Sequence, residues 1–285
     1  MPYSVSITDA EKMFPDFTFV RALTPSEQKA AFQVKDKATN TDLCLKMIAP
    51  NYERDRLDRE IQALQSINHP NVVKLIEYTF SSKAGYQRHY IVEEFIEGQD
   101  LTAILIPSKP WDVKAVAGFF SAVCDGLFAM HQKEIVHRDL KPANIRVRPN
   151  GSPVIIDFGL ARHLNLPDLT LTTAGAAIGT PRYFAPEQFD GTKHDIDHRT
   201  DLFALGILVY EALTGESPFY NSKMTSRAQL RQATCESTVH LTKPLFQALD
   251  PKWRSLVTRL LEKERARRPS DAQQVGLLLR KLGGI

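Results

Sequence analysis

The sequence lacks most of the features that mark disulfide-rich, metal-binding or membrane-spanning chains. It has three cysteines in 285 residues, Cys44, Cys124 and Cys235, an odd number without a Cys-x-x-Cys pair. This pattern argues against a zinc site or a redox dithiol and indicates reduced core thiols in a cytoplasmic protein. The longest apolar stretch, residues 202–213, is too short to span a bilayer, and the N-terminus has no signal-peptide pattern. We therefore expect no membrane segment in this chain.

Charge of one sign is also scarce. The 36 Lys and Arg side chains nearly balance the 33 Asp and Glu side chains, which leaves a net charge of +3. Such a small charge does not argue for a nucleic-acid or membrane partner. The 24% of charged and 43% of hydrophobic residues are ordinary for a globular protein. A chain of this length can bury one large core or two lobes with a cleft between them.

The N-terminal third is dominated by strand patterns. Runs of β-favouring residues between turn signals predict a small antiparallel sheet. Residues 52–67 have the apolar spacing of an amphipathic helix, and Glu60 lies beside its apolar stripe. The predicted strands are residues 17–23, 30–35, 43–48, 72–80 and 90–95.

The third of these strands carries a lysine in an unusual setting. The two-residue period of a strand puts three apolar side chains on one face and Cys44 with Lys46 on the other. A lysine beside a small apolar residue is expected to face a cleft. Residues 97–100 then break the strand pattern like a linker.

This break divides the chain into two predicted lobes, residues 1–97 and residues 98–285. The second lobe is expected to be larger and mainly helical, because long helical patterns cover residues 113–132, 201–214 and 253–263. The fold class is therefore α+β, with a sheet-based first lobe that has one major helix.

One segment of the second lobe gathers the groups that phosphoryl transfer requires. Residues 137–145 supply Asp139, a carboxylate that can receive a hydroxyl proton, and Lys141, an ammonium that can meet a phosphate. Asn144 and Asp157 supply an amide and a second carboxylate for magnesium. The sequence therefore predicts a phosphoryl-transfer site here.

A hairpin is expected to bring the two magnesium ligands together. Asn150 and Gly151 lie between β-rich runs and suit a two-residue type I′ turn, because both residue types tolerate positive φ. Such a turn would place Asn144 directly opposite Asp157, with Cβ atoms roughly 5 Å apart. One Mg²⁺ can bridge that distance through oxygen ligands at about 2.1 Å. The alternative is that the two side chains merely cap turns.

Together these motifs resemble the signature set of eukaryotic-like (Hanks-type) Ser/Thr protein kinases, over residues 17–282. The resemblance implies the bilobal kinase fold and the use of ATP and Mg²⁺. By the same resemblance, Lys46 would hold the α and β phosphates and pair with Glu60. The other positions that it implies for cofactor binding are Ser26, Lys29, Ala31, Cys44, Glu94, Ile96 and Asp157.

The resemblance also implies the roles of the catalytic residues. Asp139 would orient the substrate hydroxyl and accept its proton, and Lys141 would steady the γ-phosphate. Asn144 and Asp157 would bind Mg²⁺. Lys141 and Thr180 resemble the serine/threonine class rather than the tyrosine class.

The segment after Asp157 resembles a kinase activation segment, which docks polypeptide substrates. Residues 179–183 and 185–187 match its end. Farther on, Asp201 with Gly206 resembles the buried helix that anchors the catalytic loop. The resemblance also makes Arg268 the partner of the Glu187 carboxylate.

Arg138 resembles the residue that holds a phosphorylated activation segment in one class of these kinases. The nearby threonines are Thr170, Thr172 and Thr173. A phosphothreonine adds about −1.5 to −2 charges, enough to order a loop against arginine. We hypothesise that one of these threonines is an activating autophosphorylation site. The alternative is that they are ordinary polar loop residues.

The phosphate loop departs from the family pattern. Thr24, Ser26 and Lys29 stand where three glycines would be. Lys29 and the Ser26 hydroxyl could take over phosphate contacts, whereas Glu27 would repel phosphate if it turned inward. Either ATP binds weakly, or a partner orders the loop. A second hypothesis is that phosphorylation of Ser26 or Thr24 switches the kinase off.

Glu93 is the other departure, because it occupies the position that gates the back of the adenine pocket. A buried carboxylate there must find a partner or become neutral. It could pair with Lys46 and compete with Glu60, holding an inactive state, or the register could differ by one residue.

Three functions were compared. An active Mg-ATP-dependent Ser/Thr protein kinase that also phosphorylates itself ranks first. A pseudokinase or nucleotide-binding scaffold ranks second, because a scaffold has no chemical need for all the retained residues. A small-molecule kinase ranks last, since residues 179–187 resemble protein-substrate machinery. An activating or inhibitory protein partner is left open.

Overall fold

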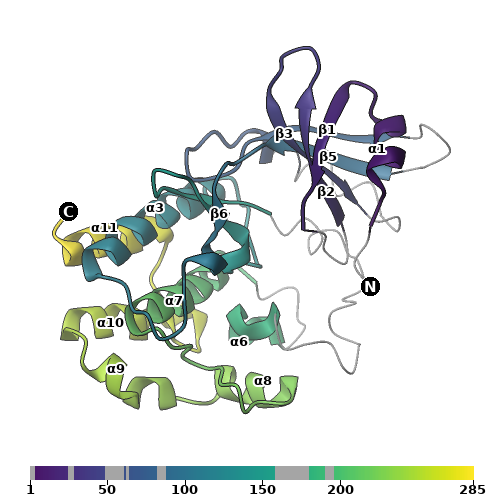
Figure 1. Cartoon of the computed structure of the whole chain (residues 1–285). Helices are drawn as coiled ribbons and strands as arrows, with labels where there is room; N and C mark the ends of the chain where they lie inside the picture. The colour runs from purple at the N-terminus through teal and green to yellow at the C-terminus, as the bar shows by residue number, and fades with distance from the viewer. Residues whose placement is uncertain are drawn as a thin grey trace. The chain divides into compact units, whose positions relative to one another are not determined.

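The computed structural model describes residues 4–24, 29–48, 61, 64–81, 88–157, 180–189 and 196–285. These residues form two compact units (Figure 1). The first holds the described residues up to His69 and those of Val73–Ile96, and the second holds Pro70–Val72 and the described residues from Glu97 onward. The change after Ile96 lies one residue before the predicted lobe boundary.

The first unit is built on a five-stranded antiparallel sheet with the order β1-β2-β3-β5-β4. The prediction of a small antiparallel sheet is confirmed, although the fourth strand begins three residues later than expected. The strands are β1 (Phe17–Ala22), β2 (Lys29–Asp36), β3 (Asp42–Ile48), β4 (Leu75–Ser81) and β5 (Arg88–Glu94).

A short helix that the sequence analysis missed, α1 (Ile7–Met13), precedes the sheet (Figure 1). Ser6 caps it by accepting a hydrogen bond from the backbone N–H of Asp9 at 3.1 Å. The buried side chains of α1 join one core cluster with the apolar face of β3. The alternation predicted for β3 is confirmed by its three members in that cluster, Leu43, Leu45 and Met47.

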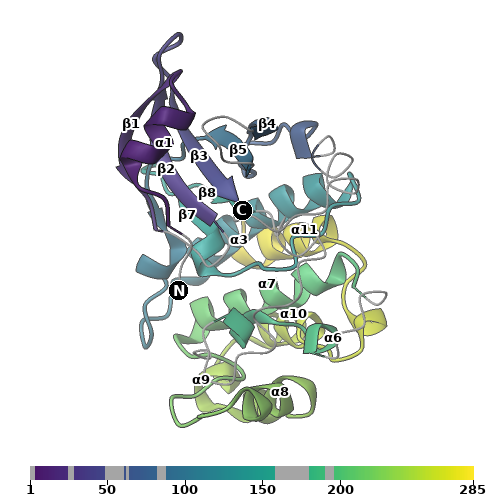
Figure 2. The same ribbon diagram turned by 90° about the vertical axis from the view of Figure 1, so that its right-hand side faces the viewer.

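The second unit is mainly helical, and α7 (Arg199–Thr214) runs through its core (Figure 2). Nearly every side chain of α7 is buried, which explains why its sequence is apolar on all sides. Helices α3 (Val113–His131) and α10 (Pro251–Leu260) pack against it. The helices predicted at residues 113–132, 201–214 and 253–263 are confirmed, the last with shifted ends, whereas most of the helix predicted at residues 52–67 lies outside the described residues. Smaller helices are α6 (Pro186–Phe189), α8 (Arg227–Cys235) and α9 (Pro244–Gln247).

Helix α11 (Ala272–Gly283) lies closely along α3. Gly283 makes this approach possible, because a Cβ at that position would overlap the Cβ of Ala117. Among the described residues, α3 alone has the length and hydropathy of a membrane-spanning helix, but half of that window is buried within the unit. Its packing against α7 and α11 is that of a core helix.

A small sheet in the second unit corrects the predicted hairpin. It consists of β6 (Gln99–Asp100), β7 (Ile145–Val147) and β8 (Pro153–Ile155), and Ile145 pairs with Ile155. The backbone of Arg148 bonds Ser152 and Gly151, so the loop is longer than the predicted two-residue turn.

The predicted register is therefore wrong by one residue. Of the two turn residues, Gly151 alone has a positive φ, at 83°. Asn150 instead accepts hydrogen bonds through Oδ1 from the backbone and hydroxyl of Ser152, at 3.0 and 2.7 Å. As a result, the carbonyl of Asn144 accepts from the N–H of Ile156, not from its predicted neighbour Asp157.

Candidate functional site

The predicted catalytic loop rests on one buried carboxylate of α7. Asp201 is 1% exposed, and its two oxygens accept from the backbone N–H groups of His137 and Arg138, each at 2.8 Å. His131 on α3 also bonds Asp201, at 2.9 Å. These bonds hold Arg138 in a left-handed conformation with φ of 62°, which is uncommon for a residue other than glycine. The Asp201 carboxylate of α7 thus fixes the conformation of the loop.

The ionised form of Asp201 makes this anchor strong. Burial alone would raise the pKa of the carboxyl group, but the hydrogen bond and charge of His131, with the charge and backbone N–H of His137, outweigh it. The pKa of Asp201 therefore lies below its usual value. The sequence analysis had placed Asp201 in a structural role, and its contacts are those of an anchor.

Three predicted catalytic residues lie within hydrogen-bonding distance of one another on this loop. The Lys141 ammonium donates to Oδ2 of Asp139 at 2.7 Å. The Asn144 amide donates to the same oxygen at 3.1 Å and to the Asp139 backbone carbonyl at 2.8 Å. The side chains of Asp139 and Lys141 are 21% and 23% exposed. The structure therefore presents a half-buried carboxylate with an ammonium beside it.

Asn144 and Asp157 are the predicted metal ligands, and both come from the β7–β8 hairpin. Because Asn144 uses its Nδ2 hydrogens on Asp139, its Oδ1 is the atom suited to a metal. Asp157 follows Ile156, the residue whose N–H bonds Asn144, and has a positive φ of 58°. An amide oxygen and a carboxylate are hard oxygen donors that fit Mg²⁺, whose other ligands are commonly waters and substrate phosphates.

In the first unit, Lys46 is buried and paired. Its Nζ lies 2.6 Å from Oε2 of Glu93, and the two side chains are 8% and 3% exposed. The sequence left two alternatives for Glu93, a pair with Lys46 or a register that differs by one residue, and this contact is the first of them. Competition with Glu60 remains untested, because Glu60 lies outside the described residues.

The sheet register places several predicted cofactor residues on the same face as Lys46. Ala31 on β2 lies directly opposite Lys46, and Cys44 on β3 lies directly opposite Glu93. Residues opposite each other in a ladder point to the same side of the sheet. This face carries the lysine, whereas the other face belongs to the core cluster.

The remaining predicted positions lie at the ends of strands or outside the described part. Lys29 begins β2, Glu94 ends β5 and accepts from the N–H of Lys74 at 2.8 Å, and Ile96 is buried just after β5. Several predictions fall on residues that lie outside the described ranges: Ser26, Glu27, Glu60, Thr170, Thr172, Thr173 and Gly179.

The predicted pair of Glu187 and Arg268 is confirmed. The guanidinium donates to both carboxylate oxygens, at 2.7 and 2.8 Å, and the Arg268 side chain is fully buried. Thr200 on α7 adds a hydrogen bond to the same carboxylate at 2.7 Å. A bidentate ion pair of this kind fixes α6 to the helical core.

Sequence reasoning missed two contacts near this segment. Gln188 on α6 donates to the backbone carbonyl of Arg138 at 2.7 Å, which ties α6 to the catalytic loop. Tyr183 donates to Glu211 on α7 at 3.0 Å, and burial raises the pKa of Glu211 to about 7 despite hydrogen bonds from Tyr183 and Ser217. No motif marks these residues, because their contacts join segments that are distant in sequence.

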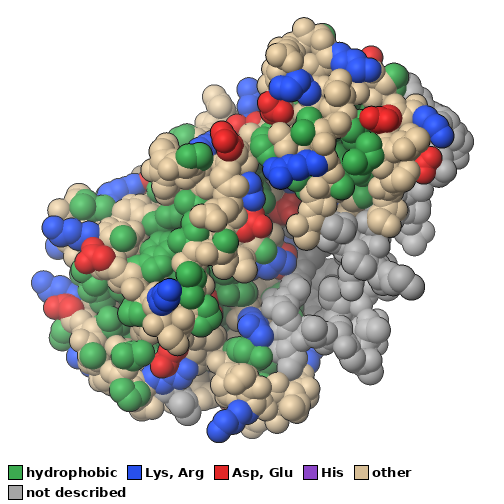
Figure 3. All heavy atoms as spheres, in the orientation of Figure 1, with side chains coloured by type: hydrophobic (Ala, Val, Ile, Leu, Met, Phe, Trp, Pro, Cys, Tyr) green, Lys and Arg blue, Asp and Glu red, His purple; other side chains and the backbone are tan. Residues whose placement is uncertain are grey.

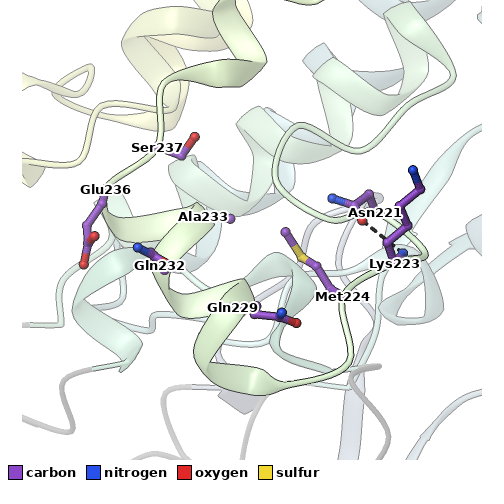
Figure 4. Close-up of a pocket in the computed structure, with 8 residues that line it drawn as sticks. All are labelled: Asn221, Lys223, Met224, Gln229, Gln232, Ala233, Glu236 and Ser237. Carbon is purple, nitrogen blue, oxygen red and sulfur yellow. Dashed lines mark hydrogen bonds between the residues drawn. The ribbon is translucent and has the colours of Figure 1, made fainter.

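A cavity of about 600 Å³ in the second unit lies elsewhere, between α8 and the loop that precedes it (Figure 4). Its walls carry amides and charges, among them Asn221, Lys223, Gln232 and Glu236. No catalytic-loop residue lines it. On the face drawn in Figure 3, basic and acidic side chains are mixed over each unit, in keeping with the small net charge.

Comparison with known proteins agrees with this geometry. The sequence model of the protein kinase domain matches residues 27–276. Serine/threonine-protein kinase pkn3 of Myxococcus xanthus is 33% identical over 224 residues, which cover 76% of this chain and 40% of that protein. Serine/threonine-protein kinase PknB of Mycobacterium tuberculosis H37Rv is 33% identical over 199 residues, 68% of this chain and 32% of PknB.

A third relative, the probable serine/threonine-protein kinase CE0033 of Corynebacterium efficiens, is 33% identical over 193 residues. These cover 66% of this chain and 29% of that protein. The chain thus matches less than half of the length of these relatives. The predicted resemblance to a Ser/Thr kinase catalytic domain and the predicted α+β fold are confirmed. By the match over residues 27–276, this chain belongs to the protein kinase family.

Proposed function

We propose that this chain is a serine/threonine protein kinase domain that transfers the γ-phosphate of Mg-ATP to Ser or Thr hydroxyls of proteins, including its own. The observation that carries the proposal is the shared contact of Lys141 and Asn144 with Asp139, on a loop anchored by Asp201. A scaffold protein has no use for this combination, so a pseudokinase is disfavoured.

Asp139 is assigned the role of general base. Among the described residues, its side-chain contacts with Lys141 and Asn144 are made through Oδ2, so Oδ1 is the oxygen we assign to the substrate hydroxyl. Lys141 is held within 2.7 Å of that carboxylate and places positive charge where the transferred phosphate would lie. Positioning and charge stabilisation of this kind are the main protein contributions to phosphoryl transfer.

Asn144 and Asp157 are assigned to Mg²⁺, and Lys46 to the α and β phosphates. When bound, Mg²⁺ neutralises charge on the phosphate oxygens. Asn144 is held for this role by its own hydrogen bonds to Asp139, which fix the direction of its amide. Lys46 is held on its strand by the register with β5 and by Glu93.

A cytoplasmic location is part of the proposal. Cys44, Cys124 and Cys235 form no disulfide among the described residues. Burial raises the pKa of Cys124, the most deeply enclosed of them, which makes it unreactive. Cysteines kept as thiols suit a reducing compartment. A protein that activates or inhibits the kinase is left open.

Label transfer from Mg-ATP tests the proposal. Wild type is expected to label itself and a generic basic protein, and Asp139→Asn to lower the rate by about 10²- to 10⁴-fold, because the general base is lost. Asp250→Asn serves as the matched control, since Asp250 only caps α10 and asparagine caps equally well. Absence of label with wild type and both substrates would contradict the proposal. Label on a small molecule but on no protein would favour a small-molecule kinase instead.

Activation by autophosphorylation is tested separately. We expect mass spectrometry to find phosphate on Thr170, Thr172 or Thr173, and a triple alanine variant to lose activity. Full activity in that variant would show that these threonines are ordinary loop residues.

If phosphorylation of the phosphate loop inhibits the kinase, Ser26→Asp should weaken ATP binding through like charge. Unchanged affinity in Ser26→Asp would rule out that switch.

A further inference from the structure

The buried carboxylate of Glu93 has a position fixed by the sheet. Glu93 on β5 lies opposite Cys44 on β3, and Lys46 lies opposite Ile91, so Glu93 and Lys46 are diagonal neighbours on one face. Their ionic groups are 2.6 Å apart, and both side chains are at least nine-tenths buried. Because β3 lies between β2 and β5 in the sheet, backbone ladders hold it on both sides.

Burial makes Glu93 dependent on Lys46. A carboxylate that is 3% exposed strongly requires a cation or hydrogen-bond donors. Lys46 supplies the ion pair that the described residues make with Glu93. If Lys46 left, the negative charge would remain buried without that partner. The ammonium is therefore expected to stay beside Glu93 throughout any reaction in which it takes part.

Lys46 can keep this contact and still bind phosphate. A lysine ammonium has three N–H donors that point in different directions. An ammonium that donates to Glu93 can therefore also donate to a second acceptor. An inhibitory clamp, in contrast, would release Lys46 when Glu93 is replaced, and so predicts a gain in activity in a Glu93 variant.

We infer that Glu93 is a positioning residue, which holds the Lys46 ammonium at the place where ATP phosphates bind. The inference rests on the proposed kinase function. In this arrangement Glu93 orients Lys46 from the neighbouring strand β5, in addition to any contribution from Glu60. This role also assigns a purpose to a carboxylate at a position that is usually apolar or a small hydroxyl.

Glu93→Gln tests the inference with an almost unchanged shape. If Glu93 positions Lys46, this variant should raise the KM for ATP and lower kcat/KM for ATP by roughly 10- to 100-fold, while the KM for a peptide substrate stays unchanged. A purely structural role would instead lower the active fraction, and hence kcat, at an unchanged KM for ATP. Wild-type kinetics, or a gain in activity, would overturn the inference.

Glu77→Gln is the matched control. Glu77 lies on β4 of the same sheet, is exposed, and accepts from the Tyr90 hydroxyl at 2.7 Å. Its register opposite Val92, which pairs with Leu45, puts it on the face of the sheet away from Lys46, so the variant should behave as wild type. Glu93→Met provides a second neutral variant in case Glu93→Gln does not fold, and it should raise the KM for ATP in the same direction.

Two readouts do not require turnover. Removal of the carboxylate disfavours the charged amine, so an amine-reactive ester should acylate Lys46 faster in Glu93→Gln, as read by mass spectrometry. Calorimetry should show weaker Mg-ATP binding. If wild type proved inactive, these readouts would still decide whether Glu93 positions Lys46 for nucleotide, whereas the proposed function would fail alone. Unchanged acylation and unchanged binding would contradict the inference.

Discussion

The catalytic loop and strand β3, which carries Lys46, each hold a charged side chain in a fixed position, but they do so through different contacts. On the loop, backbone N–H groups of His137 and Arg138 bind Asp201, and short contacts between near neighbours orient Asp139. On the strand, Lys46 is held by a carboxylate that is 47 positions away in sequence and lies on another strand. The loop therefore depends on contacts between near neighbours and on one distant anchor, Asp201, whereas the strand depends on sheet register.

This difference determines how each region responds to the substitution of one side chain. Backbone donors stay in place when one side chain changes, although the loop has a single common acceptor in Asp201. The strand pair has two buried ionic groups, and loss of Lys46 removes the cation that is paired with the buried carboxylate of Glu93. We expect loop variants to affect mainly the chemical step and strand variants to affect mainly nucleotide binding.

The largest expected effect on stability comes from the common acceptor of the loop. Asp201→Ala leaves two backbone N–H groups and His131 without their partner, and should lower the free energy of unfolding by about 3–5 kcal/mol. Urea unfolding followed by circular dichroism measures this loss. A loss near zero would show that the loop does not depend on Asp201.

The second prediction concerns Glu211, a half-buried carboxylate of α7 that accepts a hydrogen bond from the neutral hydroxyl of Tyr183 at 3.0 Å. Burial raises its pKa from 4.5 to about 7, so its protonated form stabilises the fold below pH 4.5, and this stabilisation is lost as pH rises towards 7. Glutamine cannot ionise but still accepts from Tyr183. Glu211→Gln should therefore gain stability relative to wild type between pH 5 and 8, by up to about 3 kcal/mol.

Thermal unfolding of both proteins across that pH range measures the gain. Asp112→Asn is a suitable control, because Asp112 is an exposed cap of α3. A constant difference between Glu211→Gln and wild type at every pH would contradict the raised pKa.

The smallest effect tests the corrected hairpin. Gly151→Ala should cost about 1 kcal/mol, because its φ of 83° strains any residue with a Cβ, although no atom lies within 4 Å of the added carbon. Asn150→Gly should also destabilise, because it removes the bonds from Oδ1 to Ser152. Chemical unfolding of wild type and the two variants measures these changes in stability. Stabilisation by Asn150→Gly would instead support the two-residue turn.

The sequence predicted local arrangements well. Asp139, Lys141 and Asn144 lie within six residues, so their contacts follow from a single loop conformation. The antiparallel sheet and the alternation along β3 were predictable for the same reason, since the two-residue period is a local property. The roles of these residues in catalysis stay predictions until activity is measured.

Features that depend on competition between contacts were harder to predict. The hairpin register shifted because one side-chain oxygen of Asn150 favours a longer loop. Helix α1 has few apolar residues, and its place is set by packing against the sheet. The partner of Glu93 remained open because strand register, rather than any motif, brings it beside Lys46.

The decisive measurement is the ATP dependence of phosphate transfer by wild type, Asp139→Asn and Glu93→Gln, made side by side. We expect an active wild type, a loss of kcat at an unchanged KM for ATP in Asp139→Asn, and a raised KM for ATP in Glu93→Gln. An inactive wild type would contradict the kinase function. The same change of parameter in both variants would contradict the division of labour between the loop and the strand.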